Sequence, residues 1–221
     1  MGSQKKVYKE GLIGTKIGMT QVYNAAGEAV PVTVIQLGPC TILEVKNKDK
    51  YGYSAVQLGI GEKKQQRLNK CEVGSFAKSG KGAFEYVREI RCDIEKLGWT
   101  TVGQEIKAGD VFKDGEIVDV SGTSIGRGFQ GVVRKHGMKG QPYTRGTHEV
   151  RRHMGAVGCR KYPGRIFPGK RMPGHMGAEK CTVQNLEVVK VRPEDNVILV
   201  RGGIPGHKGS LVTVIKASKI A

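Results

Sequence analysis

Two sequence patterns of this chain could carry chemistry, and both lie between Gly126 and His153. Gly126, Gly128 and Gly131 follow the GxGxxG spacing of a loop that holds the phosphates of a nucleotide. His148 and His153 stand in a pattern close to HExxH, in which two histidines on one face of a helix bind zinc. Either pattern would indicate an enzyme.

The residues around the two patterns argue against both. A dinucleotide site needs a long helix directly after the glycines, and Gly137 and Gly140 would break such a helix. The chain also lacks the VAIK, HRD and DFG motifs of kinases. His148 and His153 are one residue too far apart to share a helix face, and the two arginines between them would repel a metal ion. We predict no catalytic residue, metal site or cofactor; a nucleotide-dependent enzyme stays the alternative.

The region that holds these patterns is strongly basic. Residues 126–177 contain 12 Lys or Arg, 12 Gly, four His and a single acid, Glu149, which gives a local charge of +11. The other residues hold 25 bases and 19 acids and carry only +6 of the total +17. Arginines next to glycines give a backbone that can follow an irregular polyanion closely. The composition therefore predicts a nucleic acid as partner.

The end of the basic region favours RNA over DNA. Pro-Gly occurs three times between Tyr162 and His175, and each is expected to form a turn. The rings of Tyr162 and Phe167 offer flat faces for stacking on unpaired bases. No helix-turn-helix, zinc finger or basic zipper is present to read a DNA groove. A DNA architectural protein stays the second alternative, and a solvated flexible linker is the less favoured structural explanation.

The elements that must position this region are short β-rich runs. Asn24–Gly27 and Asp114-Gly115 are expected to form hairpin turns, the second of type I′, and residues 68–81 are expected to be helical. Many short strands at this spacing predict a closed barrel. The predicted strands are Leu12–Tyr23, Ala29–Leu37, Thr41–Lys46, Ser54–Ile60, Phe84–Ile94, Glu116–Val120, Thr182–Val191, Val197–Arg201 and Leu211–Ile215, with a turn at Pro193–Asp195.

The domain organisation follows from these runs. Residues 1–125 and 178–221 are expected to form one β-barrel domain, with a small α-containing insertion around 62–100. Residues 126–177 form a basic extension loop within it. Because this loop has few large apolar residues to offset its ordering entropy, we predict that it is mobile in the free protein and ordered only on its polyanion.

Cysteine usage and hydropathy bound the location of the protein. The five cysteines are widely spaced and include no CxxC pair, which predicts free thiols in a reducing compartment, with the cytosol as default. No run of about 18 apolar residues, basic amphipathic helix or lipidation signal supports a membrane partner. We expect the protein to stay where it is made.

Several motifs taken together resemble one protein family. They are residues 11–20 (GLIGTKIGMT), 31–35, 53–59, 118–133 (VDVSGTSIGRGFQGVV), 163–177, 183–191 and 203–206. The set is similar to the bacterial-type large-subunit ribosomal protein L three (L3) family over nearly the whole chain. Trp99 lies outside the basic loop, whereas eukaryotic members carry a tryptophan at the loop tip, which favours the bacterial type.

The resemblance implies a fold and a function. It implies a mainly β fold with a small α+β insertion: a translation-protein-like β-barrel with a long basic loop that penetrates RNA. It implies a non-enzymatic constituent of the 50S subunit that binds 23S rRNA near its 3′ end, enters assembly early and neighbours ribosomal proteins L fourteen and L nineteen. The loop would approach the peptidyl transferase centre, in a bacterial cytoplasm or an organelle. Cys159 stands where some relatives carry a methylated glutamine, so that modification is not expected here.

The resemblance also implies contact residues. Carried over to this sequence, the bases of the loop, and with them its histidines, would contact phosphates or bases of RNA. They are Arg127, Arg134, Lys135, His136, Lys139, Arg145, His148, Arg151, Arg152, His153, Arg160, Lys161, Arg165, Lys170, Arg171 and His175.

Overall fold

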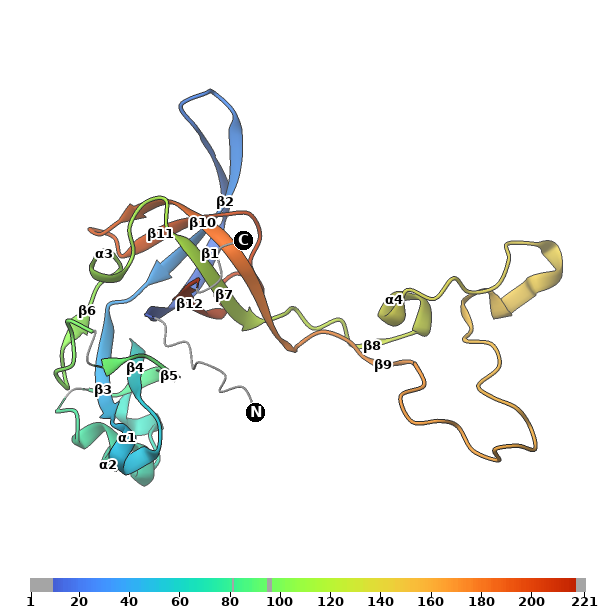
Figure 1. Ribbon diagram of the computed structural model, residues 1–221, viewed down its shortest axis with the longest axis horizontal. Coiled ribbons are helices and arrows are strands. Elements are labelled where there is room, and N and C mark those ends of the chain that lie inside the picture. Colours follow the sequence, from blue (N-terminus) through green and yellow to red (C-terminus); the bar gives the residue numbers. More distant parts are fainter. Residues whose placement is uncertain (1–9, 81, 95–96, 218–221) are drawn as a thin grey trace, which may run out of the picture. The chain divides into compact units, whose positions relative to one another are not determined.

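The structure is a computed structural model that describes residues 10–80, 82–94 and 97–217. The chain divides into two compact units, one formed by residues 1–123 and 180–221 and the other by residues 124–179. Figure 1 shows the elements of both units. The first unit contains two sheets, and the second is built mostly from irregular backbone.

A closed six-stranded barrel forms the centre of the first unit (Figure 1). Its strands follow the order β1-β12-β7-β10-β11-β2, and every neighbouring pair is antiparallel. The mainly β fold class with a closed barrel is thereby confirmed. The strands are β1 (Gly11–Tyr23), β2 (Ala29–Leu37), β7 (Ile117–Thr123), β10 (Lys180–Arg192), β11 (Val197–Arg201) and β12 (Leu211–Lys216).

Alternation of apolar side chains explains the closure. In β7, for example, Val118 and Val120 are fully buried inside the barrel, and Val212 and Val214 of β12 are buried beside them. Successive strand residues point to opposite faces, so a run with every second residue apolar supplies one buried face. Closing the sheet leaves no exposed edge in the barrel itself.

The second sheet of this unit has the order β5-β4-β3-β6 and is also antiparallel. Its strands are β3 (Cys40–Lys46), β4 (Ala55–Glu62), β5 (Phe84–Ile90) and β6 (Glu105–Ile106). Short helices lie between its strands: α1 (Lys48–Tyr51) joins β3 to β4, and the 3₁₀ turn η1 (Gln65–Arg67) and α2 (Lys70–Ala77) lie between β4 and β5. A further short helix, α3 (Ala108–Val111), follows β6 and precedes β7 of the barrel. Buried residues of both sheets, such as Ile13 and Leu58, belong to one hydrophobic core.

Most elements expected from the sequence are confirmed. The helical region is α2, which begins after Asn69, whose backbone N–H donates to the Glu72 carboxylate at 3.1 Å. Asn24–Gly27 is the tight turn between β1 and β2, with the Gly27 N–H donating to the Asn24 carbonyl at 3.0 Å. The turn at Pro193–Asp195 joins β10 to β11. The short elements α1, α3 and β6 were not predicted.

The prediction for Asp114-Gly115 is wrong in part. A turn is present, but it connects α3 to β7 and not two hairpin strands. Only Gly115 has a positive φ, of 79°, so the turn is not of type I′. The Asp114 carboxylate instead accepts the Val191 N–H at 2.6 Å, and the Gly115 N–H donates to the Val188 carbonyl at 2.8 Å. Hydrogen bonds to β10, whose residues are distant in sequence, determine the conformation of this turn.

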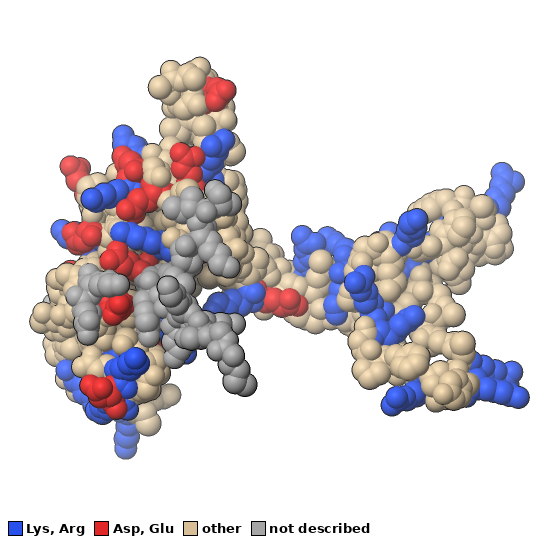
Figure 2. All heavy atoms as spheres, viewed as in Figure 1, with Lys and Arg blue, Asp and Glu red and all other residues tan. Residues whose placement is uncertain are grey.

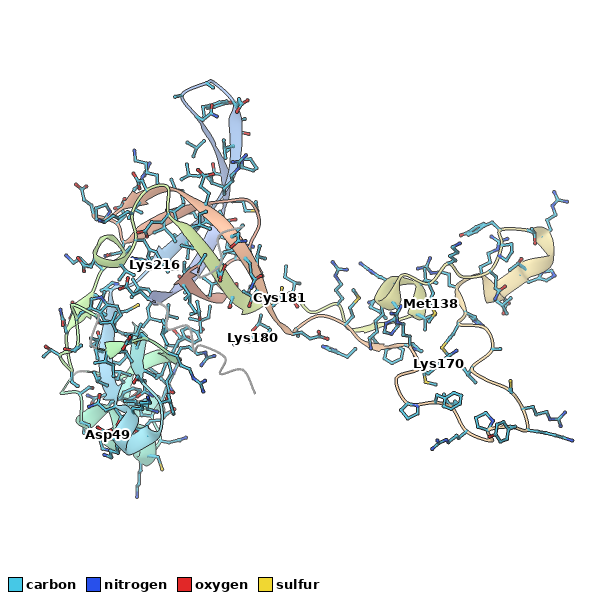
Figure 3. All side chains as sticks on the ribbon, in the orientation of Figure 1. Asp49, Met138, Lys170, Lys180, Cys181 and Lys216 are labelled. Carbon is cyan, nitrogen blue, oxygen red and sulfur yellow. The ribbon has the colours of Figure 1, made fainter. Side chains whose placement is uncertain are left out.

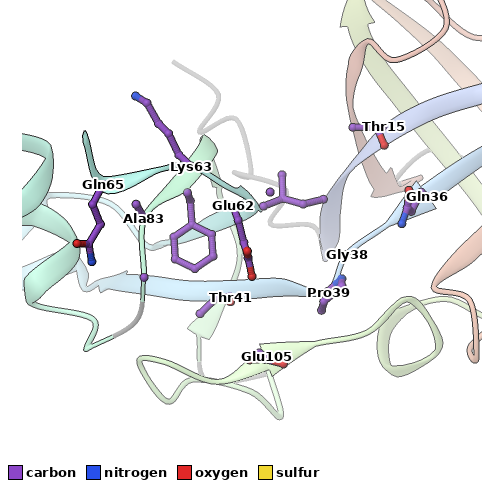
Figure 4. A pocket seen from close by; sticks show the side chains of 14 residues that line it. Thr15, Gln36, Gly38, Pro39, Thr41, Glu62, Lys63, Gln65, Ala83 and Glu105 are labelled. Carbon is purple, nitrogen blue, oxygen red and sulfur yellow. The ribbon is translucent and has the colours of Figure 1, made fainter. Parts of the chain in front are cut away.

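A hollow of about 730 Å³ lies between the two sheets of the first unit (Figure 4). Thr15 and Gln36 line it from the barrel, Glu62 lines it from the end of β4, and Lys63 and Gln65 line it from the residues that follow. Its charges are of both signs, and no residue of the glycine pattern at 126–131 contributes to it. The hollow therefore gives the nucleotide alternative no support.

Candidate nucleic-acid interface

Two antiparallel segments, residues 124–130 and 174–179, form the base of the unit 124–179, and we call them the arms. The Arg127 N–H donates to the Met176 carbonyl at 2.9 Å, and the Met176 N–H donates to the Gly128 carbonyl at 3.0 Å. Beyond them, β8 (Phe129–Gln130) pairs with β9 (Gly174–His175). Gly177 closes the arms tightly, because its φ is 78° and a Cβ atom there would lie 2.3 Å from the Ile125 carbonyl oxygen. The arms thus hold the start and the end of the basic region together.

A short helix, α4 (Val132–His136), follows the first arm and packs on the second. The His136 ring lies 3.0 Å from the Met172 carbonyl oxygen, measured from Nε2. The Lys135 ammonium comes so close to Gly174 that a Cβ atom there would lie 3.0 Å from Nζ. Arg134 and Lys135 stand with His136 in the last turn of the helix, at its carbonyl end, where the backbone dipole favours positive charge.

The helix ends at Gly137, one of the two glycines that were expected to break it. Gly137 takes a left-handed conformation with φ 66°, and its N–H donates to the Val133 carbonyl at 3.0 Å. A dinucleotide site needs a longer helix whose N-terminus faces the pyrophosphate. α4 has five residues, so the GxGxxG pattern does not have the structural context of such a site.

The histidine pattern lies in a kinked 3₁₀ segment, η3 (Arg145–Arg152). His148 has φ 45° and ψ −128°, which interrupts the helix, and His153 lies after its end. The two histidines therefore do not share a helix face. Among the described residues there is no group of three or more His, Cys, Asp or Glu that could hold a metal ion.

A stacked pair organises the outer part of this unit. The Arg151 guanidinium lies over the Tyr143 ring, and the Arg151 carbonyl accepts the Gln141 N–H at 2.9 Å. Gly140 makes this approach possible, because its φ is 74° and a Cβ atom would lie 2.4 Å from the Arg151 carbonyl oxygen. The Arg151 Nε atom is buried and has no hydrogen-bond partner among the described residues. Arg151 is thus held in place by its neighbours.

Most of the predicted contact residues are exposed. Lys135, His136 and Arg151 are half-buried and pack on the unit itself. The remaining ones are exposed: Arg127, Arg134, Lys139, Arg145, His148, Arg152, His153, Arg160, Lys161, Arg165, Lys170, Arg171 and His175. Figure 3 labels Lys170 and Met138 among the side chains of this unit.

The bases of this unit are not neutralised by acids. In the part of the chain that the structure describes, no Lys or Arg of residues 124–179 forms an ion pair. In the other unit, Lys46 pairs with Glu89, and Lys216 pairs with Glu10 at 2.8 Å. Figure 2 shows the same contrast: Lys and Arg are interspersed with Asp and Glu over the barrel unit, whereas Lys and Arg dominate residues 124–179.

Four aromatic rings of the basic unit are open to solvent. Tyr162 is 87% exposed and Phe167 63%, as their predicted stacking role requires. Tyr143, 82% exposed, and Phe129, 75% exposed, were not singled out from the sequence. Their position among arginines and glycines was the signal that could have identified them.

The expected turns at Pro-Gly are confirmed at two of three places. Gly164 and Gly169 have positive φ values of 72° and 79°. The prediction for Pro173-Gly174 is wrong, because Gly174 belongs to β9 and pairs with Gln130. Strand pairing between residues distant in sequence overrides the local turn preference at this position.

The five cysteines are free thiols, of which Cys40 and Cys92 are buried. Burial raises the pKa of the Cys40 thiol to about 11. This thiol donates to the Ile13 carbonyl oxygen at 3.2 Å. No helix within the described residues is long and apolar enough to cross a membrane.

Comparison with known proteins identifies the family. The family model described as ribosomal protein L3 matches residues 93–197. A protein of Brachyspira pilosicoli named large ribosomal subunit protein uL3 is 45% identical over 209 residues, which cover 95% of this chain and 94% of that protein. The uL3 protein of Pelotomaculum thermopropionicum is 48% identical over 210 residues, covering 95% and 98% of the two chains. For the uL3 protein of Syntrophotalea carbinolica the identity is 44% over 211 residues, covering 96% and 99%. The exposed, unneutralised basic unit and the closed barrel thus occur in a chain that belongs to the ribosomal protein L3 (uL3) family.

Proposed function

We propose that this protein is a structural, non-enzymatic constituent of the large ribosomal subunit, and that it binds 23S rRNA directly through residues 124–179. The observation that carries the proposal is the concentration of exposed bases without acidic partners in this unit. A surface of this kind repels itself unless a polyanion neutralises it.

The exposed bases supply affinity. Each phosphate that Lys or Arg neutralises releases condensed counterions, so binding falls steeply with salt. The half-buried bases have a different part: Lys135, His136 and Arg151 hold α4 and η3 against the rest of the unit. The Lys135 ammonium and the Arg151 guanidinium thus meet RNA as parts of a shaped surface and not as freely moving side chains.

The exposed aromatic rings favour RNA with unpaired bases. Tyr143, Tyr162, Phe129 and Phe167 present flat faces within a backbone that has no long helix to enter a DNA major groove. Stacking on unpaired bases contributes about 1–3 kcal/mol per base in other single-strand binders. Folded rRNA offers such bases in its loops and bulges.

The family supplies the finer parts of the proposal. In this role the protein enters subunit assembly early, extends the basic unit toward the peptidyl transferase centre without taking part in the reaction, and supports translation. Its protein neighbours would be ribosomal proteins L fourteen and L nineteen, and its location the cytoplasm, as part of the 50S subunit. No catalytic residue, metal ion or cofactor is assigned.

The direct test compares the full chain with a variant that lacks most of the basic unit. Gln130 and Gly174 are Cα partners in the β8–β9 pair, so residues 131–173 can be replaced by Asn-Gly, a two-residue hairpin turn that keeps the arms intact. Binding of both proteins to a 3′-region fragment of large-subunit rRNA is measured across a salt series. The variant lacks 11 of the 12 bases counted in residues 126–177.

The outcomes separate the alternatives. We expect tight binding by the full chain, with a log–log salt slope that is shallower by roughly five in the variant if about half of the removed bases meet phosphate. Duplex DNA of equal length serves as competitor. Equal affinity for DNA and rRNA would favour an architectural DNA-binding protein, and a slope unchanged by the deletion would refute the assignment of the interface to this unit.

A further inference from the structure

The first unit carries a ribbon of two strands that extends beyond the barrel (Figure 1). We call residues Gly18–Pro31 the β1–β2 ribbon. β12 pairs with β1 only from Gly11 to Thr15, and β11 pairs with β2 only from Val32 to Gln36. Within the described part of the chain, the β1 strand of the ribbon therefore has β2 as its only strand partner. Its outer edge presents backbone N–H and C=O groups to solvent.

Apolar side chains cover both faces of the ribbon. Met19 is 56% exposed and Tyr23 65%, and they lie on one face, because side chains alternate along a strand. Val22 and Val30 are Cα partners on the opposite face and are half-buried. A two-stranded ribbon with no layer packed on either face is marginally stable in water. Burial of these apolar side chains by a partner would therefore stabilise the ribbon.

The ribbon also differs from the rest of the chain in charge. Its 14 residues contain one acid, Glu28, and no Lys or Arg, in a chain that has 37 bases. Figure 2 shows the tip of the ribbon almost free of charged side chains. Natural proteins protect exposed strand edges with charges, lysine above all, or with proline. No charged residue or proline follows Lys16 in β1.

These features decide which kind of partner fits. RNA is disfavoured, because the ribbon has no cation to neutralise phosphate and its one charge would repel it. An extended protein segment fits the backbone groups of a free strand edge, and apolar side chains of that segment fit Met19 and Tyr23. A basic residue of the partner would complement Glu28.

We propose that the β1–β2 ribbon is a protein-docking surface, onto which another protein of the large subunit adds an extended strand along the free edge of β1. That the partner belongs to the large subunit rests on the proposed function. That the partner is a protein rests on the free strand edge, the apolar side chains and the lack of bases in the ribbon. The chain thereby has two contact surfaces of different character, a basic one for rRNA in residues 124–179 and one for protein in residues 18–31 that carries a single acid and no base.

Site-specific photo-crosslinking within assembled subunits tests the proposal. The photoreactive amino acid p-benzoylphenylalanine replaces Tyr23 in one tagged full-length chain and Tyr162, 87% exposed in the basic unit, in another. Both are expressed in bacteria, large subunits are purified and irradiated, and the crosslinked species are identified by mass spectrometry. We expect Tyr23→p-benzoylphenylalanine to crosslink a ribosomal protein and Tyr162→p-benzoylphenylalanine to crosslink rRNA.

Other outcomes overturn the proposal in distinguishable ways. In one such outcome the chain enters the subunit and yet gives no crosslink to another protein from position 23. A crosslink from this position to rRNA or to a second copy of the chain, or no crosslink at all, would refute the docking surface alone. Absence of both chains from large subunits refutes the proposed function, and the docking proposal falls with it.

Charge substitution gives an independent measurement. Met19→Lys, combined with p-benzoylphenylalanine at Tyr23, would place a charge in the docked surface, and we expect the yield of the protein crosslink to fall roughly tenfold. The matched control is Val73→Lys, since Val73 is 49% exposed on α2, outside the ribbon. Affinity of the isolated Met19→Lys protein for rRNA should equal that of the original chain. An unchanged crosslink yield in Met19→Lys would contradict the proposal.

Discussion

The guanidinium carbon of Arg151 lies 4.7 Å from the centre of the Tyr143 ring. This stack joins a residue just before the 3₁₀ segment η3 to one in the last turn of that segment, and the Tyr143 ring stays 82% exposed. Arginine stacked on an aromatic ring keeps its charge while losing little conformational freedom on binding. The pair therefore presents a cation and a flat apolar surface together, which is the combination that an unpaired nucleotide can use.

Substitution of Tyr143 should separate stacking from charge. Tyr143→Ala removes the ring but no charge, so we expect affinity for the rRNA fragment to fall roughly three- to tenfold with an unchanged salt slope. Arg152→Ala, at an exposed base of the same segment, should instead make the slope shallower by about one. Filter binding across a salt series measures both. Identical behaviour of the two variants would contradict the separate roles.

A second prediction concerns Gly140. In Gly140→Ala, the Cβ atom would meet the Arg151 carbonyl oxygen at 2.4 Å while φ stays at 74°, so the contact between Gln141 and Arg151 must open. We expect affinity for rRNA to fall about tenfold, which corresponds to about 1.4 kcal/mol of lost organisation. Gly146→Ala is the control, because a Cβ atom there meets nothing within 4 Å. Equal affinities of the two variants would show that this close approach has no part in binding.

Hydrogen exchange tests the expected mobility of the basic unit. Between Met138 and Pro173, the described backbone hydrogen bonds are few, and all but the one from Gln141 to Arg151 are local, such as those from Thr147 to Thr144 and from Lys170 to Phe167. We expect amides of this region to exchange rapidly in the free protein and slowly on rRNA. Amides of the arms, such as Arg127 and Met176, should be protected in both states. Strong protection of residues 138–173 without RNA would contradict the prediction.

The buried thiols predict a loss of stability at alkaline pH. Burial raises the pKa of Cys40 and of Cys92 from 9.0 to about 11, so the folded state keeps both protons where the unfolded state loses them. The free energy of unfolding should therefore decrease as pH rises from 9.0 to about 11, by roughly 2 kcal/mol for the fully buried Cys40. Urea unfolding at several pH values measures this. In a Cys40→Ala variant the decrease should be smaller; an equal decrease would assign it to other groups.

The last prediction concerns the anchor of the ribbon. Lys16 donates from Nζ to the carbonyl oxygens of Ile204, at 3.0 Å, and Gly206, at 2.9 Å. Lys16→Met would leave these buried carbonyl groups without a donor, so we expect a loss of about 1–3 kcal/mol in the free energy of unfolding. Lys190→Met, at an exposed base of β10, should cost less than about 0.5 kcal/mol. Equal stability of the two variants in urea would contradict this anchoring role.

The sequence predicts the fold better than it predicts the site. Alternating apolar residues, as in β7 and β12, identify the barrel strands because the strand period is local information. The predictions of a type I′ hairpin turn at Asp114-Gly115 and of a turn at Pro173-Gly174 were wrong, because contacts with Val188, Val191 and Gln130 decide the structure there. Charge composition indicates the basic unit as a whole, but it cannot show that Arg151 lies on Tyr143, since the seven residues between them must take the kinked path of η3 to bring the two side chains together.

The pairing of Thr123 with Lys180 has a consequence for how this protein can vary. These residues are Cα partners in the neighbouring strands β7 and β10. All residues between them therefore connect these two strands in the same way as a hairpin turn would. The register of the barrel is already set by the pairs that follow, and it does not depend on how many residues the turn contains. Lengthening, shortening or exchanging the excursion therefore leaves the scaffold unchanged. In the proposed rRNA-binding role, the same barrel can serve differently shaped RNA partners through changes in a single connection.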